Sequence, residues 1–426
     1  MELTMVCGGK EVAVKVPDRN VMKVITPKDI PPIKDVEGAV RHALENPTAS
    51  KRLSELAKPN YKVTLITNTP HSPGGYDRWV GLVIDELHKG GVKDDNIRFI
   101  MANGVHREIP RNIIEGILGK VSERYEVTNN QRNHKFVLKG ITPTYATPVW
   151  VNEKCADADL TIGLGALSFN NCAGYGGGVK TLCPGAVSYD TICTNHRLGV
   201  SPLSTPGNPE NPMRLDMEEM AGMANYKFII NTALNNKREI LHVVAGDPVK
   251  AHREGVKKTW GVHHFELPEQ ADILIGNSNA PWPAMGSAVN MSHLAVRKGG
   301  TMIFTQASEW PEHPAIHRSC AWWAECEDSF RKIRPDLSGV LQDIHQGRLP
   351  AWVGATVGFA VAKIMAEKEI VLVNEYLKEE HVKGSGWKIS SSLDEALRQA
   401  FDKHGRDAKV VIVPNPGRAA HLSLEK

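Results

Sequence analysis

The chain has 426 residues, of which 41% are hydrophobic and 23% are charged, and its formal net charge is +3. This length accommodates two or three domains with a full hydrophobic core. The small net charge gives no electrostatic reason to expect nucleic acid or an anionic membrane as a partner. No apolar run reaches the roughly 18 residues of a membrane span, and the first residues lack the apolar segment of a signal peptide.

Seven cysteines are scattered along the chain, and no two of them form a Cys-x-x-Cys pair. The odd number and the wide spacing disfavour both a disulfide framework and a structural zinc site. We therefore expect a protein of the reducing cytoplasm.

The first half of the chain repeats a strand–loop–helix theme. Residues 2–16 predict a β-hairpin, and a helical pattern covers roughly 36–57. Further helices are expected with Val80, Val83, Ile84 and Leu87 on one face, and from about 111 to 124. The apolar strands that precede or follow these helices are KVTLIT (62–67), IRFIM (97–101) and ADLTIGL (158–164). Such alternation is typical of a parallel sheet with right-handed crossovers.

Polar loops follow each of these three strands. They hold residues 68–71, His106 and residues 170–180. Because ligands bind outside the carboxyl ends of the strands in parallel sheets, we expect these loops to lie close together in space.

The second half predicts another α/β unit. An acidic helix near 215–223, a strand pair at 227–231 and 239–245, and a helix from 248 to about 260 complete the first unit. The strands and helices expected after that are 271–277, 286–297, 300–306, 356–367, 369–374, 392–404 and 409–414. The predicted fold class is therefore α/β, with two domains, 1–268 and 269–426, and mainly parallel sheets. The last strand could return to the first domain, and the cleft between the domains is the expected site.

The stretch from 169 to 196 holds the densest chemistry. It contains Gly174, Gly176, Gly177 and Gly178, a lysine at Lys180 and a histidine at His196. A P-loop would place glycine directly before the lysine, whereas Val179 stands there, so the motif for phosphate binding is incomplete. A plain glycine-rich turn before a helix stays open as an interpretation. The position at a sheet edge favours a functional role.

Individual histidines and a tryptophan also have ordinary interpretations. His106 is a general-base candidate at a strand end, although loop histidines are commonly just surface residues. His196 could bind a metal, but no second ligand stands near it at zinc spacing. Trp352 opens an apolar helix and by pattern alone belongs to the core.

Long motifs resemble the nickel-dependent lactate racemase family, whose members use a nickel-pincer nucleotide. They are GVH at 104–106, AGYGGGVKTLCPG at 173–185, NH at 195–196, GNPENPMRLDMEEMA at 207–221 and FIINTALNNKREILHVVAGDPVKAHREGV at 228–256. The resemblance extends to the strand with KGG at 298–306 and so spans most of the chain.

The resemblance implies a role for several residues. Lys180 corresponds to the lysine that holds the cofactor through a thioamide, and His196 to the histidine that coordinates nickel. His106 corresponds to one of two catalytic histidines, and Trp352 to a tryptophan beside the cofactor. The other cofactor-binding candidates are Asn68, Gly176, Gly177 and Gly178. One carbon and two sulfurs of the cofactor complete the nickel site, and such soft ligands in a plane suit Ni(II).

The substrate-binding positions depart from the family. The second catalytic histidine aligns with Asn170, which can hydrogen bond a substrate oxygen but cannot act as a base. His71 stands where the family has an anion-binding arginine, and we consider it as the second acid/base. The residues that contact the substrate carboxylate align with Ala284 and Ser287. A bidentate arginine and a lysine are thus both missing, so lactate itself is not the expected substrate.

The sequence therefore predicts a racemase or epimerase of a 2-hydroxy acid or a sugar-like acid. The family mechanism is proton-coupled hydride transfer through a keto intermediate, with His106 as one acid/base. The alternatives are a one-sided hydride-transfer oxidoreductase with the same cofactor, a non-catalytic cofactor carrier, and an ATP-binding module. The expected partners are cofactor-synthesis proteins, and a homodimer is possible. Nucleic acid and membrane are not expected.

Overall fold

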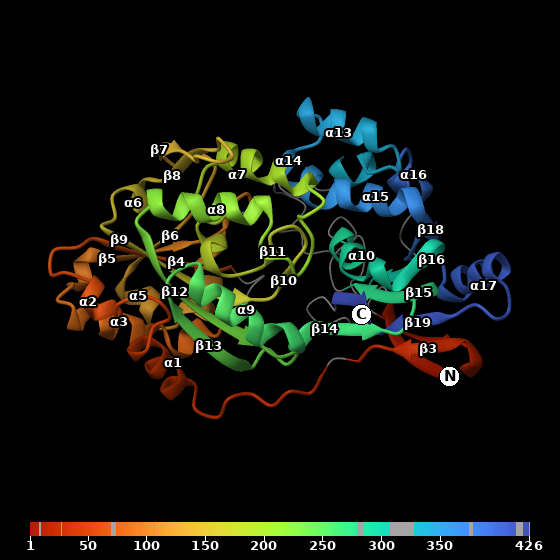
Figure 1. The fold of residues 1–426 in the computed structure, drawn as a ribbon, viewed down its shortest axis with the longest axis horizontal. Coiled ribbons are helices and arrows are strands. Elements are labelled where there is room, and N and C mark those ends of the chain that lie inside the picture. The colour runs from red at the N-terminus through yellow and green to blue at the C-terminus, as the bar shows by residue number, and fades with distance from the viewer. Residues whose placement is uncertain are drawn as a thin grey trace. The chain divides into compact units, whose positions relative to one another are not determined.

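The structure is a computed structural model that describes residues 1–7, 10–26, 28–69, 74–106, 108–278, 285–306, 328–374, 378–414 and 421–425. The chain divides into two compact units. We call Asp29–Val262 the central unit, and Met1–Lys28 together with His263–Lys426 the terminal unit. Each unit has helices around a mainly parallel sheet, which confirms the predicted α/β class (Figure 1).

The central unit is organised on a six-stranded sheet with the order β13-β12-β9-β4-β5-β6. All neighbours are parallel except β12 and β13, which form the predicted antiparallel pair. The strands are β4 (Val63–Thr67), β5 (Ile97–Met101), β6 (Glu126–Asn129), β9 (Leu160–Leu167), β12 (Tyr226–Leu234) and β13 (Ile240–Gly246). Every residue of β4 and β9 is buried, as expected for strands covered on both faces.

Helices cover both faces of this sheet (Figure 1). They are α1 (Val36–Glu45), α2 (Leu53–Leu56), α3 (Val80–Lys89), α4 (Arg111–Leu118), α5 (Val121–Arg124), α6 (Glu153–Ala156), α7 (Tyr189–His196), α8 (Pro212–Met223) and α9 (Lys250–His263). The apolar faces of α1, α3 and α4 form one hydrophobic core with the side chains on one face of the sheet, among them Leu65, Phe99 and Ile162. The opposite face is the one that carries the candidate site.

Two predicted helices are interrupted. The helix expected over 36–57 is α1 followed by the separate turn α2, because Pro47 cannot continue a helix and Ala49 has φ 51°. Between them, Thr48 forms an isolated bridge to Gly246. The helix expected over 111–124 is α4 and α5, which are separated at Gly119 with φ 60°. The short pair β7 (Phe136–Ile141) and β8 (Pro148–Asn152) was not predicted.

The terminal unit has its own six-stranded sheet, with the order β18-β17-β16-β15-β19-β3 and every neighbour parallel. Its elements are β1 (Glu2–Cys7), β2 (Lys10–Lys15), β3 (Val21–Val24), β14 (His264–Leu267), β15 (Ala271–Ser278), α10 (Gly286–Ser292), β16 (Val296–Gln306), α13 (Leu337–His345), α14 (Ala351–Val353), α15 (Phe359–Glu367), β17 (Glu369–Val373), α16 (Glu379–Val382), β18 (Lys388–Ser390), α17 (Leu393–His404), β19 (Val410–Val413) and β20 (His421–Leu424). The predicted β1–β2 hairpin is present.

The predicted domain boundaries differ from this division at both ends. Residues 1–28 belong to the terminal unit because β3 pairs with β19 and completes its sheet. The last strand, β20, pairs with β14, which lies within the predicted first domain but belongs to the terminal unit of the structure.

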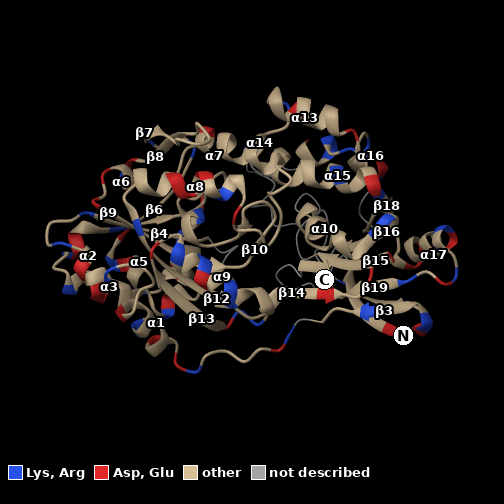
Figure 2. Cartoon of the chain, viewed as in Figure 1, with Lys and Arg blue, Asp and Glu red and all other residues tan. Residues whose placement is uncertain are grey.

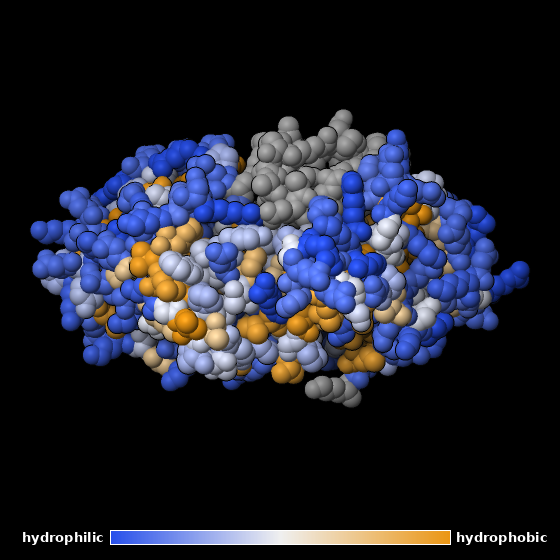
Figure 3. Space-filling model, turned by 90° about the horizontal axis from the view of Figure 1, so that it is seen from above, coloured by the Kyte–Doolittle hydropathy of each residue, from blue (hydrophilic) through white to orange (hydrophobic). Residues whose placement is uncertain are grey.

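The surface fits the modest net charge. Basic and acidic side chains are interspersed over the helices and strand ends of both units (Figure 2). On the face drawn in Figure 3, hydrophilic residues cover most of the area and hydrophobic residues form separate patches. Within the described ranges, no helix combines the length and the apolar character that crossing a lipid bilayer requires.

Candidate functional site

Three strands end side by side at one edge of the central sheet. Thr67 of β4 lies opposite Met101 of β5 and Leu164 of β9. The Ala102 amide, just past β5, donates a hydrogen bond of 2.8 Å to the Thr67 carbonyl. The loops that begin with Asn68, Ala102 and Ser168 therefore leave the sheet at the same edge, as the alternation of strands and helices predicted.

A groove for the next segment is built into β9. Gly163 and Gly165 are two residues apart, so both present the same face of the strand. A Cβ at Gly163 would overlap the Tyr226 hydroxyl, and one at Gly165 would lie 2.6 Å from the Asn231 amide nitrogen. The same position at Gly165 is 3.2 Å from the Gly177 Cα. The absent side chains thus let residues 173–181, which we call the glycine loop, pack directly on the strand.

The glycine loop needs its glycines for its own conformation. Gly174, Gly177 and Gly178 have φ of 72°, 72° and 60°, a region that other residues rarely adopt. A Cβ at Gly174 would overlap the backbone of Asn208, and one at Gly178 would lie 2.8 Å from the His252 ring. These contacts give the glycines a packing role, and their direct contact with a cofactor stays a prediction.

Four buried polar side chains hold the loop backbone. The Asn231 side-chain oxygen accepts from the Gly178 amide at 2.7 Å, and the Tyr226 hydroxyl donates to the Gly178 carbonyl at 2.8 Å. His252 Nε2 lies 3.0 Å from the Gly176 carbonyl. Arg214 binds two further carbonyls of the loop. Since buried backbone groups need partners, this network fixes one loop conformation.

Lys180 lies in a short 3₁₀ turn, Gly178–Thr181, directly after the glycines. Its half-buried side chain makes no hydrogen bond or ion pair with any described residue. Burial lowers the pKa of the amine to about 8, and the nearby Arg214 cation acts in the same direction. A tenth of the amines, roughly, would then be neutral at pH 7. A neutral amine is the nucleophilic form, so Lys180 suits covalent attachment.

His196 is the last residue of α7, whose first turn is capped by the Ser188 side chain. The ring is buried, and its Nδ1 has no hydrogen-bond partner in the described part of the chain. Burial, with help from the charge of Lys180, lowers the pKa to about 3. The ring is therefore neutral near pH 7, and neutral imidazole is the metal-binding form. The Lys180 charge is among the causes that lower the His196 pKa, so the two side chains lie near each other.

A buried network supports the end of α7. The Asn195 amide nitrogen donates to Asp216 at 2.8 Å and to the Met213 carbonyl at 2.9 Å. Asp216 also accepts from the hydroxyls of Thr142 and Thr147, at 2.6 and 2.9 Å. These bonds join α7 to α8 and hold the residue next to His196 in place.

The loop of His106 contacts the residues that follow Lys180. The Gly104 amide donates to the Gly185 carbonyl at 3.2 Å, and a Cβ at Gly104 would lie 2.9 Å from the Pro184 carbonyl oxygen. The His106 amide donates to the Asn103 carbonyl at 2.9 Å, which closes the turn around this half-buried histidine. The structure thus brings the His106 loop against the segment that carries Lys180.

Asn170 closes the short hairpin of β10 (Phe169–Asn170) and β11 (Gly174–Tyr175). Its side-chain oxygen accepts from the amides of Ala173 at 3.0 Å and Cys172 at 3.4 Å. Its amide nitrogen donates to no described residue. Asn170 therefore has a structural role through its oxygen and can still offer a donor to a ligand.

The other predicted site residues are Asn68, His71, Ala284, Ser287 and Trp352. His71 and Ala284 lie outside the described residues. Ser287 is a half-buried residue of α10, and Trp352 a half-buried residue of α14, both in the terminal unit. Asn68 follows β4 at the site edge and is half-buried.

Sequence reasoning assigned no role to the residues that hold the site together. They are Gly163, Asn195, Arg214, Asp216, Tyr226, Asn231 and His252. The alternate glycines of β9 were a readable signal, because glycines two apart in a strand mark a close approach of other backbone. The hydrogen bonds of Arg214 and Asp216 join segments distant in sequence, so no local pattern reveals them.

Comparisons with known proteins agree on one family. A sequence model described as the lactate racemase N-terminal domain matches residues 7–207, and one for the lactate racemase C-terminal domain matches residues 358–418. Lactate racemase from Thermoanaerobacterium thermosaccharolyticum is 25% identical over 422 residues, which cover 96% of each chain. Lactate racemase from Lactiplantibacillus plantarum is 25% identical over 396 residues, with 88% of each chain covered. The chain belongs to the lactate racemase family. It is a racemase, an enzyme of the isomerase class.

Solved structures show the same fold. The structure of the lactate racemase apoprotein from T. thermosaccharolyticum superposes with a TM-score of 0.84 at 22% identity over the whole of both chains. A crystal structure of a Thermotoga maritima protein gives 0.63 at 15% identity, covering 88% of this chain and 96% of that one. The lactate racemase N-terminal match includes Lys180, His196, His106 and Asn170, whereas Trp352 lies outside both matched segments.

Proposed function

We propose that this chain is a nickel-pincer-nucleotide-dependent racemase or epimerase of a 2-hydroxy acid or related hydroxyl-bearing acid, other than lactate. The observation that supports the proposal most is that a half-buried lysine, Lys180, lies near enough to the buried His196 for its charge to act on that ring. Burial keeps an amine partly neutral and an imidazole neutral there, with pKa values of about 8 and about 3. These are the protonation states that covalent attachment and metal coordination require.

The chain's own residues fit the proposed group. Lys180 would hold it covalently, and the buried Nδ1 of His196, which has no protein partner in the described residues, is consistent with a ring held for coordination. The described residues contain no group of three or more His, Cys, Asp and Glu side chains arranged to hold a metal ion. A cofactor that brings most of its own ligands needs only one histidine. When bound, it would supply a hydride acceptor and donor for the hydroxyl-bearing carbon of the substrate.

The proton chemistry falls to side chains of the loops at the sheet edge. We assign His106 as one acid/base that takes and returns the hydroxyl proton, because its loop packs against the Lys180 segment. Asn170 would orient a substrate oxygen through its amide nitrogen, since its oxygen is bound to the backbone. His71 remains our candidate for the second acid/base.

Substrate preference is the part that separates this chain from its relatives. Those relatives are named lactate racemases. Here the positions proposed to meet the substrate are His71, Asn170, Ala284 and Ser287, none of which carries a fixed positive charge. Without an arginine fork, a small carboxylate has no bidentate partner at these positions. A larger hydroxy acid, held by hydroxyl contacts as well, fits better.

The test is made on protein co-expressed with the cofactor-synthesis proteins. One pure stereoisomer of each acid in a panel of 2-hydroxy and sugar acids, including lactate, is incubated in deuterated water. We expect both stereoisomers to form, with the original hydrogen retained on the carbon and no accumulation of keto acid. His106→Gln should lose this turnover, while the matched variant His134→Gln, of an exposed histidine, should retain it.

Each alternative gives a different product pattern. Keto acid without the opposite stereoisomer would indicate one-sided hydride transfer. Deuterium at the racemised carbon would contradict hydride return and indicate proton abstraction. Bound nickel without turnover on any acid would indicate a carrier. Full turnover by His106→Gln would contradict the role of His106.

The cellular setting follows from the same proposal. We place the enzyme in the reducing cytoplasm, because its cysteines are scattered and odd in number. The cofactor-synthesis proteins would be its transient partners.

A further inference from the structure

Arg214 is a charged residue at a buried position, where removal of its side chain from water is unfavourable. It lies in the first turn of α8, where the Asn211 side chain caps the helix by accepting from the Arg214 amide at 3.0 Å. Its side chain is fully buried and makes no ion pair within 4 Å with a described residue, although the Glu218 carboxylate acts on it from farther away. Removing a guanidinium from water without a carboxylate in direct contact costs several kcal/mol, roughly, so its hydrogen bonds must serve a definite purpose.

Those hydrogen bonds hold the glycine loop at two neighbouring points. Arg214 Nε donates to the Ala173 carbonyl at 2.8 Å, and its Nη2 donates to the Tyr175 carbonyl. The two carbonyls flank Gly174, whose φ of 72° sets the direction of the chain. The fixed, planar fork of arginine can bind both carbonyls at once, which a lysine ammonium on a flexible stem cannot reproduce.

The segment held in this way leads directly to Lys180. Gly174 and Tyr175 form β11, and Gly176 to Gly178 connect it to the turn that carries the lysine. The guanidinium also lies close enough to Lys180 for its charge to act on the amine. Arg214 therefore holds the loop on the N-terminal side of Lys180 and lies near the amine.

We propose that Arg214 is a positioning residue for Lys180: its two-point hold on the carbonyls of Ala173 and Tyr175 sets the glycine loop so that the amine is presented for acylation. This inference rests on the proposed attachment role of Lys180. A purely structural role and a purely electrostatic role are the competing explanations, and they predict different results.

The test measures the acylation of Lys180 in the apoprotein with N-hydroxysuccinimidyl acetate. Peptide mass spectrometry gives its rate, and the exposed Lys227 of β12 serves as an internal reference. The variants are Arg214→Lys, which keeps the charge but not the fork, and Arg214→Gln, which removes the charge. The matched control is Arg98→Lys, because Arg98 also donates to a backbone carbonyl, that of Lys154 at 2.6 Å, and to the Thr64 hydroxyl at 3.1 Å.

Positioning predicts that both Arg214 variants slow Lys180 relative to Lys227 by at least about tenfold, since a small displacement of a reacting group costs that much or more. The defect should persist at pH 10, well above the Lys180 pKa of about 8, and Arg98→Lys should show none. A wild-type rate in Arg214→Lys, or a defect that disappears at high pH, would assign the effect to charge and overturn the proposal.

Urea unfolding of each variant separates positioning from stability. If neither Arg214 variant folds, Arg214 is a stability residue and the proposal is contradicted. The outcome for Lys180 itself is separate: a wild-type Lys180 that is inert at every pH would count against its attachment role, and so against the proposed function. Equal rates in the wild type and the variants would count only against Arg214.

Discussion

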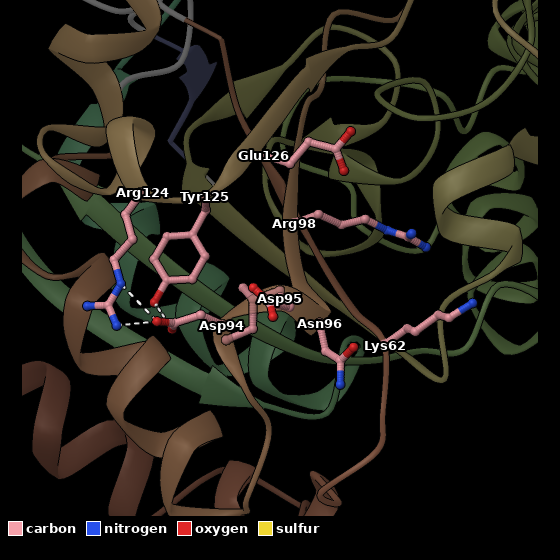
Figure 4. Close-up of a pocket in the computed structure, with 9 residues that line it drawn as sticks. Lys62, Asp94, Asp95, Asn96, Arg98, Arg124, Tyr125 and Glu126 are labelled. Carbon is pink, nitrogen blue, oxygen red and sulfur yellow. Dashed lines mark hydrogen bonds and ion pairs between the residues drawn. The ribbon is translucent and has the colours of Figure 1, made fainter.

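The two edges of the central sheet carry opposite kinds of polar chemistry. At the carboxyl edge, Lys180 is half-buried and His196 is buried, and desolvation lowers the pKa of both. At the amino edge, a cavity of about 320 Å³ is lined by charged residues at the starts of β4, β5 and β6 (Figure 4). There Asp94 binds Arg124 and Tyr125, and Lys62 binds Asp157, which lies outside the cavity lining.

The two edges differ in the interaction partners of their polar side chains. At the amino edge each of these charges has an opposite charge or a hydroxyl beside it, in contact with solvent, where ion pairs contribute little. At the carboxyl edge Lys180 has no protein partner among the described residues, while neighbouring side chains such as Asn231 and Tyr226 are committed to the loop backbone. A search for charged side chains would therefore select the amino edge. Polar groups without a protein partner instead identify the carboxyl edge, where the candidate site lies.

The largest expected effect is at the proposed metal ligand. His196→Ala should lower nickel retention by more than the roughly 10–100-fold that loss of a mere supporting group costs, because it removes the ligand itself. Nickel is quantified in protein co-expressed with the cofactor-synthesis proteins. His134→Ala, an exposed histidine, is the control. Unchanged nickel in His196→Ala would contradict the assignment.

The groove in β9 gives the next effect. Gly163→Ala should destabilise the fold by about 3 kcal/mol, because the new methyl group overlaps the Tyr226 hydroxyl and meets the Thr181 hydroxyl oxygen at 2.7 Å. Gly116→Ala, in exposed helix α4 with no atom within 4 Å of the new Cβ, should instead stabilise by about 0.5–1 kcal/mol. Urea denaturation measures both. Equal effects of the two substitutions would contradict the close packing of the glycine loop on β9.

Acid unfolding distinguishes the two edges, because each loses its contribution to stability over a different pH range. Burial lowers the pKa of His252 well below its ordinary value, so the unfolded chain binds a proton that the folded chain does not. Stability therefore falls as pH drops below about 6.5, with about 1.4 kcal/mol per pH unit from this residue. His252→Gln should keep a donor for the Gly176 carbonyl and reduce that slope by one proton. An unchanged slope between pH 6.5 and 5 would show that His252 is protonated in the fold.

The smallest effect belongs to the amino edge. The Tyr125 hydroxyl donates to Asp94 at 2.5 Å, and this bond, with help from Arg124, lowers the Asp94 pKa to about 2. An acid with a lowered pKa stabilises above its unfolded value and loses that contribution as pH falls towards 2. Tyr125→Phe should therefore cost about 1 kcal/mol at pH 7 and nothing at the lowest pH. A change in Lys180 acylation in this variant would show that the edges are coupled.

Much of the fold followed from the sequence because its signals are local. The β4 and β5 strands, the β12–β13 pair and helix α3 were predicted from apolar runs and periodicity, and the meeting of three strand ends followed from their parallel order. The breaks at Ala49 and Gly119 were missed because apolar periodicity continues across them. The placement of β3 was missed because its partner β19 lies nearly 400 residues later.

Only some of the residues of the candidate site could be predicted from the sequence. Lys180, His196 and His106 were found through the resemblance, and the structure brings their segments together. The buried state of Lys180 and His196 is a tertiary property, since it arises from α8, α9 and β12 closing over the glycine loop. Asn170 shows the limit most clearly: its role as a turn residue comes from two backbone amides that no pattern could assign to it.

The central claim is that Lys180 carries a nickel-containing cofactor. The most direct measurement is the intact and peptide mass of the protein after co-expression with the cofactor-synthesis proteins, together with its nickel content. We predict a covalent mass increase confined to the Lys180 peptide and stoichiometric nickel, both lost in Lys180→Ala. An unmodified Lys180 under those conditions would contradict the account.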